Sequence, residues 1–253
     1  MTLKEIEEKY RITADYHTHT RYSRVGLYIH ASGTIMDNVR AAHEKGLSEV
    51  AITDHGPTDF YGLDPKLIPQ MRRGIEEAMK AYPDVKVYLG VEADIVDSPN
   101  GLDVAPEEFN DYDFVNAGYH YVPNCNKIRN FLAFHGRGTA ATIEELRYDN
   151  TERIVKALKS NNIKILTHPG DKAYIDVEAV AKACEETGTL VEINARHRHP
   201  NEDELRIFAA HDVKFVISSD AHRADKVGRY AKSLALAFAA GIDVSRIVNI
   251  EER

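Results

Sequence analysis

Short runs of β-branched and apolar residues alternate with amphipathic helical patterns along the whole chain, and this alternation restricts the possible folds more than any other feature. Such an alternation favours a parallel sheet whose strands are connected by crossover helices. The helical segments carry apolar residues about 3.6 positions apart, as at Met71, Ile75, Ala78 and Tyr82. Strands are predicted at Ile12–His19, Glu49–His55, Val85–Asp94, Phe114–His120, Lys164–Pro169, Leu190–Ala195 and Lys214–His222.

These elements predict one α/β domain over residues 1–253, because no linker, low-complexity stretch or internal repeat interrupts the pattern. Seven β/α units are one fewer than in the usual eight-stranded barrel, so the expected architecture is a seven-stranded TIM-like barrel. The longest stretch without a predicted element is Val122–Ala141, which follows the fourth strand. It carries Lys127, Arg129 and Arg137, so we interpret it either as a cover over an anionic substrate or as a solvated loop.

Charge and cysteine content disfavour several classes of function. The chain has 32 Lys and Arg against 40 Asp and Glu, a net charge of −8, so no global basic field would attract nucleic acid. It has neither an apolar export segment at its N-terminus nor a stretch apolar enough to span a membrane. Cys125 and Cys184 form no CxxC pair, which argues against a disulfide framework or a zinc ribbon. We therefore expect a cytoplasmic protein of unspecified oligomeric state that acts on a small molecule.

Nearly every predicted strand ends in a side chain that binds metal ions. In a parallel β/α barrel, the C-terminal ends of the strands meet on one face, where active sites lie. His17 and His19 point to the same side, because side chains alternate along a strand. One histidine at a strand end is usually an ordinary hydrogen-bonded residue, but here six strands share the feature. The candidate ligands are His17, His19, His55, Glu92, His120, His168, Asp220 and His222.

These side chains offer nitrogen and oxygen donors, a combination that suits Zn²⁺, Mn²⁺ or Fe²⁺ better than the oxygen-rich sites of Mg²⁺ and Ca²⁺. One zinc ion takes three or four protein ligands, so this set predicts at least two ions, with Glu92 free to bridge them. Closely spaced ions can bind a phosphoryl group and lower the pKa of a bound water toward neutrality. The residues therefore predict a metal-dependent hydrolase whose nucleophile is a metal-bound hydroxide.

The same segments resemble the PHP (polymerase and histidinol phosphatase) superfamily over nearly the whole chain. The resemblance is carried by Asp15-x-His17-x-His19-Thr20, Ile52-Thr53-Asp54-His55-Gly56-Pro57, Gly90-x-Glu92, His120, His168-Pro169-Gly170, Glu192-Ile193-Asn194 and Ser219-Asp220-Ala221-His222. These motifs are most similar to the small stand-alone, YcdX-like phosphoesterase branch. The resemblance implies a distorted seven-stranded barrel with up to three metal ions, typically zinc, and nine ligands.

The ninth ligand implied by the resemblance is a histidine between the first two strands. The family places it a few positions after the HxH pair, where this chain has Val25. We assign the role to His30, because His30-Ala31-Ser32-Gly33-Thr34 matches the family's His-x-x-x-Thr run if a short insertion lies within Arg24–Ile29. The alternative for His30 is an ordinary loop histidine.

The resemblance also implies how the ligands divide among three ions. One ion takes His17, His19, Glu92 and Asp220; a second takes Glu92, His120 and His168; the third takes His30, His55 and His222. Asp15 and Asp54 lie next to ligands, so we interpret them as partners that orient imidazoles or, alternatively, as caps of neighbouring helices. Asp15 is accordingly placed among the candidate catalytic residues.

A phosphate monoester needs positive charge beyond that of the metal ions, and arginine donates two parallel hydrogen bonds to such a group. Arg196 follows the sixth strand and Arg223 follows His222, so both are candidate phosphate-binding residues. His197 and His199 occur in the same segment as Arg196. We interpret them as loop residues, with contact to the substrate as the alternative.

The expected function is thus hydrolysis of a small phosphate monoester at a trinuclear site, with histidinol phosphate phosphatase as the alternative within the family. Amidohydrolases also begin with HxH, but they often bridge their metals with a modified lysine at the end of strand four, where this chain has His120; Lys164 begins its strand instead. The acidic balance and the lack of a polymerase module argue against nucleic-acid processing. A non-catalytic module is disfavoured, since structural zinc sites are closed by four ligands.

Overall fold

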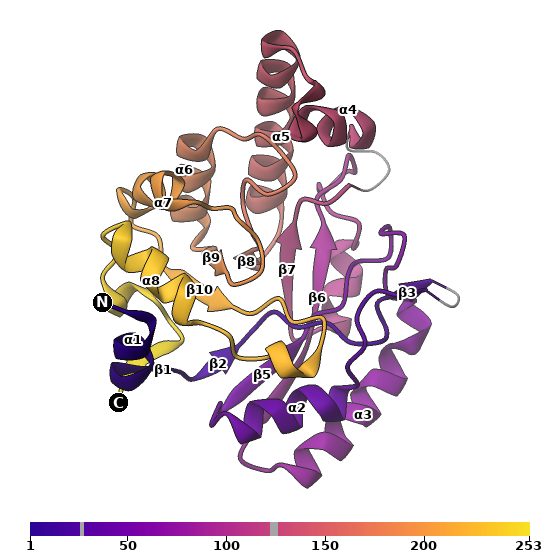
Figure 1. Cartoon of the computed structure of the whole chain (residues 1–253). Coiled ribbons are helices and arrows are strands. Elements are labelled where there is room, and N and C mark those ends of the chain that lie inside the picture. The colour runs from indigo at the N-terminus through magenta and orange to yellow at the C-terminus, as the bar shows by residue number, and fades with distance from the viewer. Residues whose placement is uncertain (26–27, 122–125) are drawn as a thin grey trace.

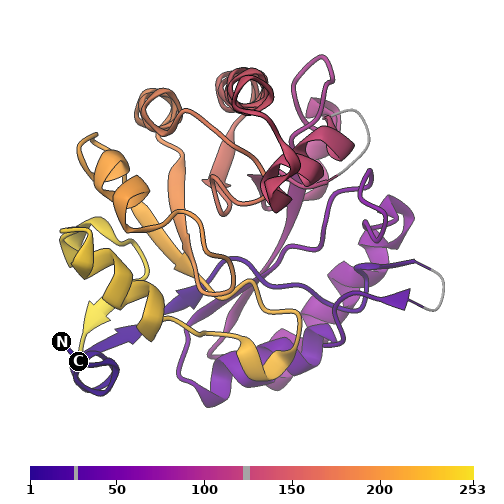
Figure 2. The same cartoon turned by 45° about the horizontal axis from the view of Figure 1, so that its top comes forward.

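The computed structural model describes residues 1–25, 28–121 and 126–253. Seven parallel strands, in the order β10-β9-β8-β7-β6-β5-β2, form a nearly closed barrel surrounded by helices (Figure 1, Figure 2). This architecture confirms the predicted seven-stranded, distorted TIM-like α/β barrel. The strands are β2 (Ala14–Asp15), β5 (Glu49–Ile52), β6 (Lys86–Asp94), β7 (Phe114–Gly118), β8 (Ile163–Leu166), β9 (Leu190–Asn194) and β10 (Phe215–Ser218).

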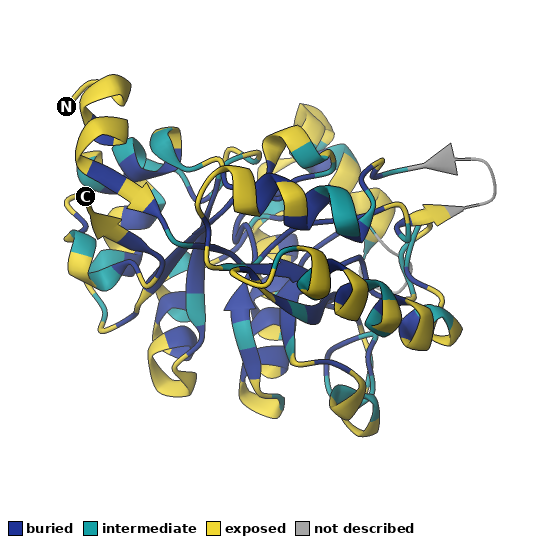
Figure 3. Cartoon of the chain, turned by 90° about the horizontal axis from the view of Figure 1, so that it is seen from below, coloured by how far each residue is buried: buried dark blue, intermediate teal, exposed yellow. Residues whose placement is uncertain are grey.

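The helices bury an apolar stripe against the barrel and expose their outer faces, whereas the barrel strands are mostly buried (Figure 3). In α3 (Ile68–Ala81), the buried Met71, Ile75 and Ala78 follow the predicted helical period. Along the parts of the chain that the structure describes, no helix is both long and apolar enough to cross a membrane. The other helices are α1 (Leu3–Lys9), α2 (Ile35–Glu44), α4 (Lys127–Leu132), α5 (Ala140–Ser160), α6 (Val177–Thr187), α7 (Glu202–Ala209) and α8 (Ala231–Ala239).

Two short antiparallel ladders lie outside the barrel. β1 (Tyr10–Ile12) pairs with β11 (Ile250–Glu252), which brings the two ends of the chain together. β3 (Arg24–Val25) pairs with β4 (Tyr28–Ile29) where the insertion was expected, although residues 26 and 27 of that segment lie outside the described residues. The predicted extent of the first strand is wrong, because the chain forms β1, then the two-residue β2, and continues to the HxH pair without regular strand pairing.

The prediction that Val122–Ala141 lacks regular structure is wrong. Residues 122–125 lie outside the described residues, but α4 and a kinked π-helical turn (Ala133–Arg137) precede α5. Asn130 of α4 donates a hydrogen bond to the Tyr119 hydroxyl (2.9 Å), and Asn150 of α5 donates one to Asn130 Oδ1 (2.8 Å). A six-residue helix is not stable alone, so these buried long-range contacts explain why it forms here. Figure 1 shows α4 and the first part of α5 projecting beyond the barrel.

The seam of the barrel lies between β2 and β10, which do not pair as strands. Asn249 fills this gap. Its Nδ2 donates hydrogen bonds to the carbonyl oxygens of Ala14 (2.7 Å) and Ile217 (2.6 Å), and its Oδ1 accepts one from the Ile217 N–H (3.0 Å). Farther along, an isolated bridge joins Thr18 to Ala221. One buried amide and the segment that carries the HxH pair therefore close the barrel.

Replacing the seam amide should destabilise the whole domain. We expect Asn249→Ala to lower the free energy of unfolding by about 2–4 kcal/mol, because it removes these hydrogen bonds and leaves buried backbone groups unpaired. Chemical denaturation measures the loss, with the exposed Asn110→Ala as the matched control, expected to change it by less than about 0.5 kcal/mol. Equal stabilities for the two variants would contradict the role assigned to Asn249.

Candidate metal centre

The candidate ligands meet where the barrel strands end. Seven of them are buried, whereas His30 and His222 are half-buried at the rim. His168 and Asp220 adopt left-handed backbone conformations, with φ of 31° and 49°. Such conformations cost energy in residues other than glycine and are retained where the surrounding structure enforces them, often at functional sites.

Glu92, at the end of β6, lies between two groups of histidines. Its Oε2 lies 3.2 Å from Nε2 of His17 and 3.1 Å from Nδ1 of His55. Its Oε1 lies 2.9 Å from Nε2 of His168 and 3.6 Å from Nε2 of His120. The two oxygens of one carboxylate thus face different imidazoles, which is the arrangement that a bridging ligand requires.

Asp220 organises the other side of the cluster. Its Oδ1 lies 3.3 Å from Nε2 of His19 and 3.2 Å from Nδ1 of His222. The rings of His19 and His55 stack with centroids 4.3 Å apart. His30 reaches this group, since its ring centroid lies 4.5 Å from that of His222 and 5.3 Å from that of His55. The structure therefore brings all nine candidate ligands into one cluster.

Several buried nitrogen atoms in this cluster make no hydrogen bond of acceptable geometry within the described residues. They are Nδ1 of His19, both ring nitrogens of His55 and Nδ1 of His168. An unsatisfied buried polar group costs about 1–3 kcal/mol. Sets of three donors also lie within 4.8 Å of one another, among them His17 with His19 and Glu92. Orphaned nitrogen donors beside carboxylates fit ligands of transition-metal ions.

Electrostatics favours an ionised carboxylate at Glu92 and neutral imidazoles at His19 and His30, the forms that bind metal ions. Burial would raise the pKa of Glu92, but the surrounding histidines hold that pKa well below its usual value. Burial lowers the pKa of His19 well below its usual value and that of His30 to about 3. His17 differs, because nearby carboxylates outweigh its burial and raise its pKa. A proton on His17 would have to leave before the ring could bind a metal ion.

Two carboxylates to which the sequence analysis gave no role hold ligand rings from behind. Glu192 Oε1 lies 2.7 Å from Nδ1 of His17, and Asp94 Oδ1 lies 2.5 Å from Nδ1 of His120. A carboxylate at the second ring nitrogen fixes the orientation and tautomer of a metal-binding histidine. Asp94 lies two positions after Glu92 on the same strand, so side-chain alternation would have placed it on the same side.

Asp15 and Asp54 support the backbone around the cluster. Asp15 accepts hydrogen bonds from the N–H groups of Ser219 (3.1 Å) and Gly228 (2.8 Å). Asp54 accepts them from the N–H and the hydroxyl of Thr20, both at 2.7 Å. Burial raises the pKa of both carboxyls. These contacts fix the segments that carry the ligands, whereas the rings are held by Glu192 and Asp94.

The two candidate arginines differ in position. Nη1 of Arg196 lies 3.2 Å from Nε2 of His222 and 3.5 Å from Oδ1 of Asp220, at the rim of the cluster. Arg223 is exposed, and its Nε donates a hydrogen bond to Asp225 (3.0 Å). The structure therefore brings Arg196 to the candidate ligands and directs Arg223 toward the surface.

Lys172 is a further cation that the sequence analysis missed. After burial, its charge is the largest influence that lowers the pKa of His120, and it acts in the same direction on His168. Lys172 is half-buried and has a left-handed φ of 64°. It follows His168-Pro169-Gly170 by two positions, which was the available signal.

Unlike Lys172, the cations of α4 and of the turn that follows it form an ion pair or are exposed. Arg129 forms an ion pair with Glu145 of α5 (2.5 Å). Lys127 and Arg137 are exposed. The idea that this segment covers a substrate stays a prediction.

His197, interpreted from the sequence as a loop residue, lies against the cluster. Its Nδ1 is 2.9 Å from Oδ2 of Asp171, and its Nε2 is 3.0 Å from Oδ2 of Asp220. The centroid of its ring lies 4.6 Å from that of His168. Only the histidine-rich sequence of its segment indicated that this residue could lie near the site.

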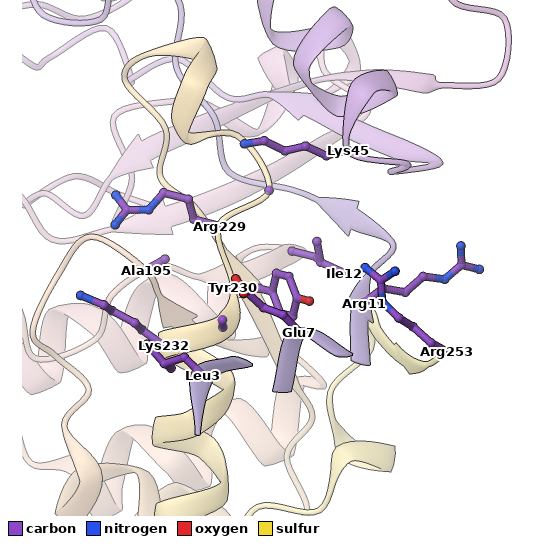
Figure 4. A pocket seen from close by; sticks show the side chains of 12 residues that line it. Leu3, Glu7, Arg11, Ile12, Lys45, Ala195, Arg229, Tyr230, Lys232 and Arg253 are labelled. Carbon is purple, nitrogen blue, oxygen red and sulfur yellow. The ribbon is translucent and has the colours of Figure 1, made fainter. Parts of the chain in front are cut away.

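A cavity of about 480 Å³ lies elsewhere, between α1, the start of α8 and the neighbouring loops (Figure 4). Its charged lining residues are Glu7, Arg11, Lys45, Arg229, Lys232 and Arg253. None of the nine candidate ligands lines it. The metal centre is therefore identified by the chemistry of its side chains and not by the size of a cavity.

Comparison with known proteins agrees with this geometry. The PHP domain model matches residues 15–196, which include seven of the nine candidate ligands. The chain belongs to the PHP domain family. Its relatives in this family include a probable phosphatase of Thermoanaerobacter sp. (strain X514), which is 30% identical over 256 residues that cover 95% of this chain and 91% of that protein. The probable phosphatase YcdX of Shigella flexneri is 28% identical over 254 residues, covering 94% and 90%. The predicted PHP family, YcdX-like branch and phosphatase class are confirmed.

Among solved structures, this PHP chain is similar to histidinol phosphate phosphatase from Lactococcus lactis subsp. lactis Il1403, complexed with zinc, L-histidinol and phosphate. The TM-score is 0.63 at 17% identity, and the match covers 91% of this chain and 94% of the other. Similarity at this level of identity shows a shared fold.

The carboxylates behind the ligand rings provide a test of the centre. We expect Glu192→Gln to lower the affinity for at least one metal ion about 10–100-fold, because it removes the carboxylate that orients His17. Competition with a chromogenic zinc chelator measures this affinity. Glu185→Gln, which changes an exposed carboxylate beside His211, is the matched control and should bind metal like the wild type. Unchanged affinity in Glu192→Gln would show that the ring of His17 does not depend on Glu192.

Proposed function

We propose that this PHP-family protein is a metal-dependent phosphatase that hydrolyses a small phosphate monoester at a site for up to three Zn²⁺ ions, with Mn²⁺ or Fe²⁺ as alternatives. The observation that carries the proposal is the cluster of nine nitrogen and oxygen donors around Glu92. One zinc ion uses three or four protein ligands, so the cluster suits several ions. Relatives that match more than nine-tenths of the chain are named probable phosphatases, which supports this reaction class.

Divalent ions bound at this site would supply Lewis acidity and an activated water. The protein residues would fix where that chemistry occurs. Glu92 and Asp220 contribute the buried negative charge that attracts cations, and the carboxylates behind His17 and His120 hold those rings in place. The position of the reacting phosphate would therefore be set by rigid strand ends.

Two protein cations support an anionic substrate. Arg196 reaches His222 at the rim, and Lys172 lies close enough to His120 to lower its pKa. Positive charge at these two places is a local feature, because the chain as a whole carries a net charge of −8. We assign the phosphate contact to Arg196 in preference to Arg223, whose guanidinium pairs with Asp225.

The placement of Lys164 argues against the amidohydrolase alternative. Lys164 lies near the start of β8, with its ammonium group 4.2 Å from the ring centroid of Phe114 and 4.4 Å from that of Tyr16. The end of β7 leads to His120. A modified lysine bridging the metals from that strand is therefore not part of the proposal.

The reaction class is tested with a generic substrate. We expect the protein loaded with Zn²⁺ or Mn²⁺ to hydrolyse p-nitrophenyl phosphate, to lose this activity in EDTA and to regain it with metal, because the phosphate would be bound and activated by the ions. Elemental analysis should find two to three ions per chain. A metal content at or below one after reloading, or hydrolysis of amides without phosphatase activity, would contradict the proposal. A screen of phosphorylated metabolites that includes L-histidinol phosphate would then identify the substrate.

The phosphate-binding arginine is tested by a matched pair of variants. We expect Arg196→Ala to lower kcat/KM about ten- to a hundredfold, since a charge-assisted hydrogen bond contributes about 1.5–3 kcal/mol. Arg223→Ala should behave like the wild type, and metal content should be unchanged in both. If Arg196→Ala also has wild-type kinetics, the phosphate contact comes from another cation, and Lys172→Ala is the next variant to measure.

A further inference from the structure

Three histidines at the barrel end share one arrangement, and one of them is outside the nine expected ligands. In His17 and His120, Nδ1 faces a buried carboxylate while Nε2 faces Glu92, at 3.2 and 3.6 Å. In His197, Nδ1 faces Asp171 and Nε2 faces Asp220, at 2.9 and 3.0 Å. A carboxylate on one ring nitrogen and an acidic cluster at the other is typical of metal-binding histidines. His197 is thus built like a ligand.

The backbone around His197 keeps the ring in this position. The side-chain oxygen of Asn194, the last residue of β9, accepts hydrogen bonds from the N–H groups of Arg196 (2.7 Å) and His197 (3.0 Å). The side chain of His197 is only 15% exposed. From this turn, Arg196 reaches Oδ1 of Asp220 while His197 reaches Oδ2. The two neighbouring residues therefore approach Asp220 at its two different oxygens.

The surroundings of Nε2 offer donors for a metal ion. His168, His197 and Asp220 each present a ligand atom, and these atoms lie within 4.8 Å of one another. Nδ1 of His168 is buried and makes no hydrogen bond to any residue that the structure describes. Three protein ligands with nitrogen and oxygen donors suffice for a zinc ion that keeps a further position for water or substrate.

We propose that His197 is a tenth metal-binding residue, which binds a divalent transition-metal ion through Nε2 together with Asp220 and His168, while Asp171 orients its ring. This inference rests on the proposed metal-dependent function and extends its ligand set. Asp220 would then bridge, with Oδ1 toward His19 and Oδ2 toward His197, as Glu92 does on the other side. In the competing role, His197 forms hydrogen bonds to Asp171 and Asp220 and does not contact a metal ion.

Zinc affinity distinguishes the two roles. Competition with a chromogenic chelator is measured on the wild type, His197→Ala and His197→Gln. We expect both variants to lose about one ion per chain or to bind one ion at least tenfold more weakly, because glutamine can still donate a hydrogen bond to Asp220 but is a poor zinc ligand. His199→Ala is the matched control, since His199 pairs with Glu204 (2.8 Å), and it should bind zinc like the wild type.

A second readout reports the ligands directly. In the Co²⁺-loaded protein, His197→Gln should change the visible d–d absorption bands, whereas His199→Ala should not. Asp171→Asn keeps the imidazole and should lower the affinity for one metal ion about 10–100-fold. This variant provides a test if the His197 variants fold poorly. Wild-type zinc content, affinity and Co²⁺ spectrum in His197→Gln, or wild-type affinity in Asp171→Asn, would overturn the proposal.

These measurements need no substrate, so they separate this inference from the proposed function. Absence of phosphatase activity in the fully metal-loaded wild type would contradict the proposed reaction without changing the metal affinities. Wild-type metal binding in His197→Gln would show that His197 is not a ligand. The proposed phosphatase activity would still be tested separately with p-nitrophenyl phosphate.

Discussion

The fully buried carboxylate of Glu92 is the group on which the rest of the centre depends. An isolated buried charge costs several kcal/mol, so the carboxylate has to be surrounded by groups that stabilise it. Neighbouring strands and the segments that follow them provide a hydrogen bond and space for this carboxylate. The Thr167 hydroxyl donates a hydrogen bond to Oε1 (2.8 Å), and Gly118 leaves space, since a Cβ there would lie 2.9 Å from the same oxygen. The strand ends converge around one acid, and the histidines that they carry converge with them.

Several buried acids lie close together at the barrel end. Glu92, Glu192, Asp171 and Asp220 all have pKa values below their usual ranges, because the attraction of nearby histidines outweighs burial. The same carboxylates raise the pKa of His17 despite its burial, so they favour a proton on this ring. Protons and metal ions therefore compete for the same ring, and metal affinity falls as the pH falls. The acids that make the cluster costly without cations are the source of its affinity for them.

Features set by local sequence pattern were predicted well. The alternation of strands and helices indicated the barrel, and the HxH spacing indicated that His17 and His19 share one side, where their Nε2 atoms lie 3.0 Å apart although both residues follow the end of β2. Features that depend on long-range contacts were not predicted. Asn249 meets Ala14 and Ile217 only after the barrel closes, so nothing near it in the sequence marks it as the seam residue. The six-residue α4 depends in the same way on α5.

The candidate site shows the same division. Ligands that lie on a strand or a few residues past its end were identified because their positions follow from the strands. His197 lies three residues past the end of β9, and the direction of its side chain depends on the turn that Asn194 fixes. Lys172, in a left-handed conformation after a Pro-Gly pair, is another residue whose direction depends on a turn. Sequence patterns can place a residue near a site, but the geometry of the turn decides whether its side chain enters it.

The exposure of the ligands indicates from which side a substrate would enter the proposed site. His17, His19 and Glu92 are completely buried, whereas His30 and His222 are half-buried. At this more open side, the ring of His30 stacks on Tyr61 with centroids 3.6 Å apart, and Arg196 lies 3.2 Å from His222. A substrate that arrives from solvent would therefore meet the half-buried histidines and the arginine before the buried acids. The proposed phosphate substrate would suit this order, because its charge would be drawn to the cation at the rim and repelled by Glu92 until metal ions neutralised that carboxylate.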